Sequence, residues 1–204
     1  MGAPNLSGSR RVAAVSMFTA LAVATDYAML PLANVKLMDC IVFVSTLAFG
    51  VGVGASVAGL TWLVYGTVNP LGADSGSFLV LLIASEMVYV LFAMLARGLL
   101  NPGQGIPSRS VTWGALGVTA TFLYDINTIV TPYLVIGQSF PVILAELPFA
   151  APFMLAHELS NFVFFATVAP LLYAAIRRVA YRPGGAAAQP ARSKPTMSET
   201  APAL

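Results

Sequence analysis

Charged side chains are scarce in this 204-residue sequence: they make up 9% of it, whereas hydrophobic residues make up 58%. The mean hydropathy is +0.83. Soluble domains usually carry about 25% charged residues. The composition therefore excludes an ordinary soluble domain and predicts an integral membrane protein, with the lipid bilayer as its surroundings and no nucleic-acid partner.

Cysteine and histidine each occur once, as Cys40 and His157. One cysteine excludes a disulfide framework and a thiolate metal cluster, and one histidine excludes a His-rich metal site. Gly50, Gly52 and Gly54 superficially resemble a nucleotide-binding loop, but no strand precedes them and both flanks are apolar. We expect no metal and no other cofactor.

Long apolar runs separated by turns rich in Gly and Pro predict an all-α, polytopic membrane protein with six transmembrane helices. The turn 137–152 holds three prolines and is expected to be a short broken segment at the surface. One membrane domain, 10–182, would lie between a polar leader, 1–9, and a disordered cytoplasmic tail, 183–204. The six helices are expected at about residues 12–30, 37–49, 55–68, 77–99, 110–136 and 153–181.

The first apolar run has an alternative interpretation as a signal peptide. Arg10 and Arg11 precede the run, and residues 20–22 resemble a cleavage site. The run is long enough to span a bilayer and continues past that site, which favours a helix.

Basic residues are distributed unevenly over the expected turns, and this predicts the orientation. Only Lys36 falls on the side opposite the termini. Cytoplasmic loops are enriched in Lys and Arg, so both termini are expected to be cytoplasmic. The residues on the side of the termini are Arg10, Arg11, Arg97, Arg109, Arg177, Arg178, Arg182, Arg192 and Lys194.

Polar side chains inside the apolar segments indicate a candidate binding site. Such side chains are costly in a bilayer and normally face a bundle interior or a cavity. Helical spacing places Tyr124, Asn127 and Thr128 on one face of their segment, and His157 and Asn161 on one face of theirs. All the buried acids fall in the outer half of the expected helices, which predicts an outward-facing cup with an apolar floor.

The cup is expected to have aromatic walls and hydrogen-bonding groups suited to a small polar molecule. Asp39 has two interpretations, as a member of the cup or as a charge at a helix N-terminus paired with Lys36. The aromatic candidates are Trp62, Tyr65, Tyr89 and Tyr124, and the hydrogen-bonding candidates are Glu86, Asp125, Asn127, Thr128, His157 and Asn161.

Small residues recur at every fourth position of the first helix, at Ser16, Ala20, Ala24 and Ala28. A stripe of small side chains allows two helices to approach closely in lipid, where packing drives association. The pattern predicts a contact face for a partner helix.

The order of segments resembles a known family of membrane proteins. An Ala-rich first helix is followed by VKLMD, by the Gly-broken LAFGVGVGASVAGLTWLVYGTVNP, by FLYDINTIVTP and by HELSNFVFFATVAP. Over residues 10–180 this order is similar to the substrate-specific S component of energy-coupling factor (ECF) vitamin transporters.

The resemblance implies a six-helix protein that binds one micronutrient with high affinity and is not itself an enzyme. Its expected partners are a membrane coupling subunit and two cytoplasmic ATPases. The family's Ala-x-x-x-Ala docking signature matches Ala20 and Ala24, and the loop after the first helix, with Asn34 and Lys36, would help to close the site.

Two other functions stay open at the level of the sequence. A stand-alone secondary transporter or channel needs polar groups through both halves of the bilayer or an internal repeat. An intramembrane enzyme would use His157 with Glu158 or Asp125 as a base, without a recognisable nucleophile motif.

Overall fold

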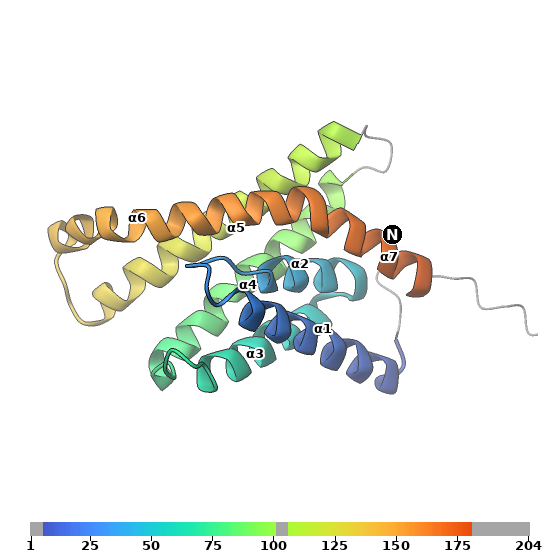
Figure 1. Cartoon of the computed structure of the whole chain (residues 1–204), viewed down its shortest axis with the longest axis horizontal. Coiled ribbons are helices and arrows are strands. Elements are labelled where there is room, and N and C mark those ends of the chain that lie inside the picture. The colour runs from blue at the N-terminus through green and yellow to red at the C-terminus, as the bar shows by residue number, and fades with distance from the viewer. Residues whose placement is uncertain (1–5, 101–105, 181–204) are drawn as a thin grey trace, which may run out of the picture.

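In a computed structural model, residues 6–100 and 106–180 are described, and they form helices joined by short turns (Figure 1). Helices α6, η1 and α7 follow one another without a break, so the described residues form six helical rods. This confirms the all-α fold and the six helices. Residues 1–5 of the expected leader, 101–105 of a turn and the expected tail 183–204 lie outside the described residues. The elements are α1 (Gly8–Met29), α2 (Met38–Phe49), α3 (Val51–Thr67), α4 (Gly76–Leu99), α5 (Ile106–Val135), α6 (Phe140–Val163), the π-helical turn η1 (Phe164–Val168) and α7 (Ala169–Ala180).

Within the part of the chain that the structure describes, three segments are long and apolar enough to cross a membrane: Gly8–Met29, Gly76–Arg97 and Phe140–Val179. Helices α2 and α3 are apolar but shorter. Helix α5 has 30 residues, and its polar side chains lower its hydropathy. Several such helices in one chain are typical of a multi-pass membrane protein.

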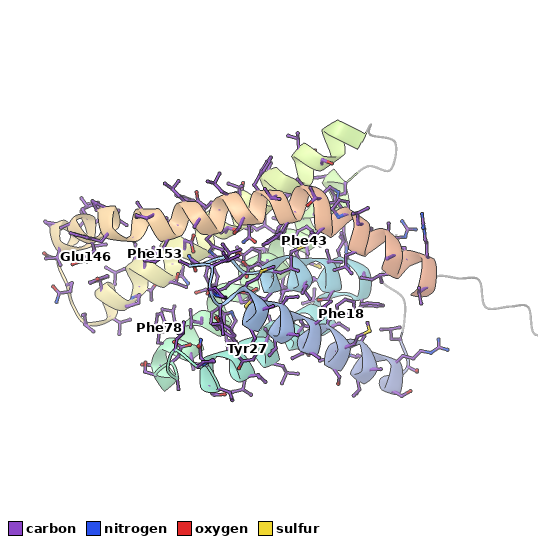
Figure 2. The ribbon with its side chains drawn as sticks, in the orientation of Figure 1. Phe18, Tyr27, Phe43, Phe78, Glu146 and Phe153 are labelled. Atoms are coloured by element: carbon purple, nitrogen blue, oxygen red, sulfur yellow. The ribbon has the colours of Figure 1, made fainter. Side chains whose placement is uncertain are left out.

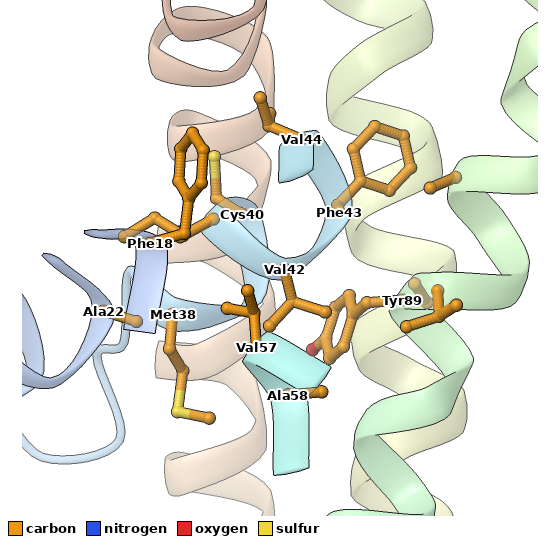
Figure 3. Packing of buried hydrophobic residues seen from close by; sticks show 14 of the residues in the cluster. Phe18, Ala22, Met38, Cys40, Val42, Phe43, Val44, Val57, Ala58 and Tyr89 are labelled. Carbon is orange, nitrogen blue, oxygen red and sulfur yellow. The ribbon is translucent and has the colours of Figure 1, made fainter. Parts of the chain in front are cut away.

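Helix α2 forms the centre of the bundle. Every residue from Met38 to Ala48 is buried, as expected for a helix that is apolar on all sides. Helices α1, α3, α4 and α7 contact it. Val42 of α2, Val57 of α3 and Tyr89 of α4 belong to this core (Figure 3), so the side chains of α2 are positioned by neighbours on every side.

The reversal between α2 and α3 is tighter than the sequence predicted. Of Gly50, Gly52 and Gly54, only Gly50 has a positive φ, of 96°, and α3 begins at Val51 rather than near Ala55. Gly54 therefore lies in the first turns of α3, where a Cβ would meet the Thr46 side chain of α2. The glycine is needed for the close approach of two helices as well as for the turn.

The expectation of a broken segment over 137–152 is wrong. Helix α6 begins at Phe140 and includes Pro148 and Pro152 in its interior. Pro141 occupies the first turn, where a backbone N–H would have no partner within the helix, so the helix loses no hydrogen bond at this proline. The two internal prolines each remove one backbone hydrogen bond, but the segment packs along α5, and a helix still pairs most of its remaining backbone groups.

Helices α5 and α6 form a hairpin that extends beyond the other helices, at the left of Figure 1. Glu146 and Phe153 mark this extension in Figure 2. A groove of ≈ 530 Å³ lies between the two helices, lined mostly by apolar side chains together with Thr128, Tyr133 and Glu146. The core of the bundle lies to one side of this hairpin.

Candidate functional site

Polar side chains from four helices converge beside the N-terminal end of α2. Asp39 is the second residue of α2 and is 1% exposed. Helices α5 and α6 each direct two polar residues toward it, Thr121 with Asp125 and His157 with Asn161, because residues four apart share a helix face. Tyr89 of α4 completes the group, and all of these side chains are buried.

His157 bridges two carboxyl groups. Its Nε2 lies 2.7 Å from Asp39 Oδ2, and its Nδ1 lies 2.8 Å from Asp125 Oδ1. A neutral imidazole donates through only one nitrogen, so the second contact requires a further proton, on the ring or on a carboxyl group. Both ring nitrogens are engaged, and neither is free to act as a base toward a substrate.

The hydrogen-bond partners of Asn161 fix the orientation of its amide. Its Nδ2 donates to Asp39 Oδ2 and to Thr121 Oγ1, both at 2.7 Å. The Thr121 hydroxyl donates to Gly117 O at 2.8 Å. The Tyr89 hydroxyl lies within donating distance of Thr121 Oγ1, at 3.0 Å, and of Asp39 Oδ2, at 3.2 Å. The amide oxygen of Asn161 is left without a partner.

A second part of the site combines an acid with aromatic rings. Trp62 Nε1 of α3 donates to Glu86 Oε2 of α4 at 3.0 Å. The rings of Trp62 and Tyr124 are nearly parallel, 14° apart, with centroids separated by 6.5 Å. Tyr124 also contacts Tyr89 and meets the His157 ring edge-on, so it connects the two parts of the site.

Several buried polar atoms in this cluster have no hydrogen-bond partner. They are Glu86 Oε1, Asp125 Oδ2, Asn161 Oδ1 and the hydroxyl of Tyr124. Buried polar groups in proteins are nearly always paired, and an unpaired one costs about 1–3 kcal/mol. The Asn161 oxygen is an acceptor only, and so are the two carboxyl oxygens when their groups are ionised. The arrangement is suited to a ligand that supplies donors.

The loop between α1 and α2 covers the cluster. Asn34 Nδ2 donates to Phe153 O of α6 at 3.0 Å, and Lys36 Nζ lies 4.5 Å from the centroid of the Trp62 ring. At the end of the loop the Met38 N–H approaches Asp26 Oδ1 of α1 at 3.4 Å. The loop thus contacts α1, α3 and α6 at once.

Asp74 lies near this end of the molecule, in the turn between α3 and α4. Its backbone N–H donates to Gly66 O at 2.8 Å. Partial burial raises the pKa of its carboxyl, and the positive charge of Lys36 opposes the shift. The turn therefore adds a further acidic side chain near Lys36.

The structure brings together most of the residues that the sequence indicated, but the site is closed rather than an open cup. Asn127 and Thr128 stand apart from the cluster. Asn127 Nδ2 donates to Ser85 Oγ at 2.7 Å, whereas Thr128 lines the groove between α5 and α6. The predicted residues within the cluster are 0–9% exposed, and they are Trp62, Tyr65, Glu86, Tyr89, Tyr124, Asp125, His157 and Asn161.

Sequence reasoning underestimated Asp39 and missed Thr121. Asp39 was expected either in the cup or paired with Lys36, and its ion-pair partner is His157. An acid placed directly before the apolar run of α2 was the available signal. Thr121 lies one turn before Asp125 on the same helix face, a spacing that the sequence already contained.

The π-helical turn η1 was also not predicted. It begins three residues after Asn161 and contains Phe165, whose ring packs against Tyr89 and Phe43. π-Helical turns insert one residue into a helix and are frequent at functional sites. Here the turn lies next to the polar cluster, because Phe165 packs against Tyr89, a member of that cluster.

Among the residues that the structure describes, no group of three His, Cys, Asp or Glu side chains is placed to ligate a metal ion. Comparisons with protein-family models, curated proteins and solved structures find no match.

Proposed function

We propose that this chain is the membrane-embedded, high-affinity substrate-binding subunit of an ATP-driven, ECF-type transporter for a small water-soluble micronutrient. The observation that carries the proposal is the buried polar cluster with its unpartnered atoms. Keeping polar groups unpaired in a bundle core is costly, and a ligand with complementary groups removes that cost. Aromatic walls with a few directional polar groups are the usual composition of a small-molecule site.

In this proposal six helices span the membrane and both termini are cytoplasmic. The described arginines of the first, fourth and last rods support this orientation, because Arg10, Arg97 and Arg177 all lie at helix ends opposite to the loop that carries Lys36 (Figure 1). The loop between α1 and α2 then faces outward and forms the entrance. Its contact between Asn34 and Phe153 has to break for a substrate to enter.

Uptake driven by ATP requires partner proteins, since the sequence contains no phosphate-binding loop. The proposed partners are a membrane coupling subunit and two cytoplasmic ATPases, and the chain itself is not an enzyme. The exposed surface of α1 supports the docking role. The stripe of Ser16, Ala20, Ala24 and Ala28 lies on the exposed side of the helix, opposite to its buried residues Ala14, Phe18, Ala22 and Asp26.

The direct test is mass spectrometry of small molecules released from the purified chain after expression in rich medium. We expect one micronutrient at a stoichiometric amount. Absence of any bound compound from a medium shown to contain the common micronutrients would contradict the proposal.

A second experiment tests the mode of transport. We expect liposomes containing the chain with a coupling subunit and ATPases to take up the identified compound only when ATP is supplied. Uptake by the chain alone would instead support a stand-alone transporter.

A further inference from the structure

The unpartnered atoms of the cluster indicate the chemical class of the substrate. Glu86 Oε1, Asp125 Oδ2 and Asn161 Oδ1 come from three different helices, and all three accept hydrogen bonds. Glu86 and Asn161 are 0% exposed, so bulk water does not satisfy them. The bonds already formed fix which atoms remain free, because both hydrogens of the Asn161 amide are used by Asp39 and Thr121.

The charged groups of the site also indicate the class of the ligand. Four carboxyl groups, those of Asp26, Asp39, Glu86 and Asp125, are buried here. Two basic groups face them, His157 and Lys36, and His157 is already held between two of the acids. A buried excess of acids favours a ligand that brings positive charge.

The aromatic residues add a preference for shape and charge. The ring of Trp62 already holds a cation at its face, since Lys36 Nζ lies 4.5 Å from its centroid and 5.8 Å from that of Tyr65. Cations are attracted to the faces of Trp and Tyr rings, and more strongly where water is excluded. The nearly parallel rings of Trp62 and Tyr124 provide flat surfaces on which a planar group can stack.

We infer that the substrate carries a planar cationic nitrogen group with several N–H donors, of the amidinium or amino-substituted heterocycle class. This inference rests on the proposed function and specifies its ligand. The N–H groups donate to Glu86, Asp125 and Asn161. The positive charge is balanced by the acids, and the plane stacks on the aromatic rings, where it takes over from the ammonium of Lys36.

The test uses three probes of nearly equal shape: benzamidinium, which is cationic, benzamide, which is neutral, and benzoate, which is anionic. Binding to the full chain, purified in detergent and washed free of bound compounds, is measured by calorimetry. We expect benzamidinium to bind at least tenfold more tightly than benzamide, and benzoate to show no binding. Equal affinity for the three probes, a preference for benzoate, or no binding of benzamidinium would overturn the inference.

Two substitutions with opposite effects on charge separate recognition from structural damage. Glu86→Gln keeps the shape and the bond from Trp62 but removes a negative charge, and we expect at least a tenfold loss of benzamidinium affinity. Lys36→Gln removes the competing positive charge, and we expect benzamidinium affinity to rise. Glu146→Gln is the matched control, because it makes the same substitution in the groove between α5 and α6, away from the cluster. It should leave benzamidinium affinity unchanged. Any other pattern of the three variants would overturn the inference.

Failure of the inferred substrate class can be distinguished from failure of the proposed function. A stoichiometric micronutrient that is anionic, or that has no N–H donor, would keep the binding-subunit proposal and overturn the substrate class. A chain without any bound micronutrient and without ATP-dependent uptake would contradict the proposed function itself.

Discussion

Asp39 is the residue on which the polar cluster depends. Its Oδ2 atom lies within hydrogen-bond distance of His157, Asn161 and Tyr89. Asn161 donates to this oxygen, and the His157 ring and the Tyr89 hydroxyl also contact it, in a place where an unpaired acid would be costly. Removing one partner of such a buried pair typically costs about 3–5 kcal/mol, so the cluster is part of the folded core as well as a candidate site.

Asn161 is a better position than His157 for a substitution that removes ligand binding while the chain stays folded. We expect Asn161→Ala to abolish retention of the co-purifying micronutrient, because it removes an unpartnered acceptor and the amide that donates to Asp39 and Thr121. Asp125→Ala should have the same effect. Both variants should remain helical and monodisperse, as measured by circular dichroism. Thermal melting should show a loss of stability of about 1–3 kcal/mol for Asn161→Ala and of about 3–5 kcal/mol for Asp125→Ala, which removes a partner of the buried His157. Wild-type retention in both variants would refute this assignment.

At the scale of single elements, the close contact of α2 and α3 depends on Gly54. An added methyl group would meet the Thr46 side chain, so we expect Gly54→Ala to destabilise the chain by about 1–3 kcal/mol. Gly59 of the same helix is the control. Its Cβ would have only Ile83 nearby, at 4.0 Å, and Gly59→Ala should stabilise by about 0.4–1 kcal/mol. Thermal melting of both variants in detergent tests the pair, and equal effects would contradict it.

Helix α1 has a buried side and a side that lacks a partner within the chain. We expect Ala20→Leu or Ala24→Leu to reduce assembly with a coupling subunit at least tenfold, because close helix packing tolerates only small side chains. Ligand affinity should stay unchanged. Ala84→Leu provides a matched control, since Ala84 is exposed on α4. Co-purification of the complex measures assembly, and intact assembly in both α1 variants would rule out this docking face.

At the scale of the whole molecule, the proposed orientation can be tested with single cysteines. The natural Cys40 is fully buried, so it should not react in the folded protein. We expect Leu32→Cys, in the loop between α1 and α2, to react with a membrane-impermeant maleimide added to intact cells. Ser9→Cys, at the start of α1, should react only after permeabilisation. The reverse pattern would invert the proposed topology.

The hairpin of α5 and α6 shows how the elements give the molecule its shape. About 25 Å of helix lie between Phe140 and His157, so α6 extends well past the level of the cluster. The extension follows from continuing a helix through two prolines. Its groove separates Thr128 from the cluster, although Thr128 is only three residues from Asp125 in the sequence.

The sequence alone determined the class of the protein. Scarce charge, long apolar runs and helical spacing of polar residues are local properties, and they predicted an all-α chain and most members of the cluster. The same spacing paired His157 with Asn161, because the α-helix repeats regardless of what surrounds it.

Only the tertiary structure decided which polar groups meet and which remain unpartnered. Asp39 and His157 are 118 residues apart in the chain, and no local pattern connects them. The closing of the site by the loop with Asn34, and the helix through Pro148 and Pro152, also depend on packing against other helices. The free energy of burying a polar side chain is set by its neighbours in space, and these are known only once the chain is folded.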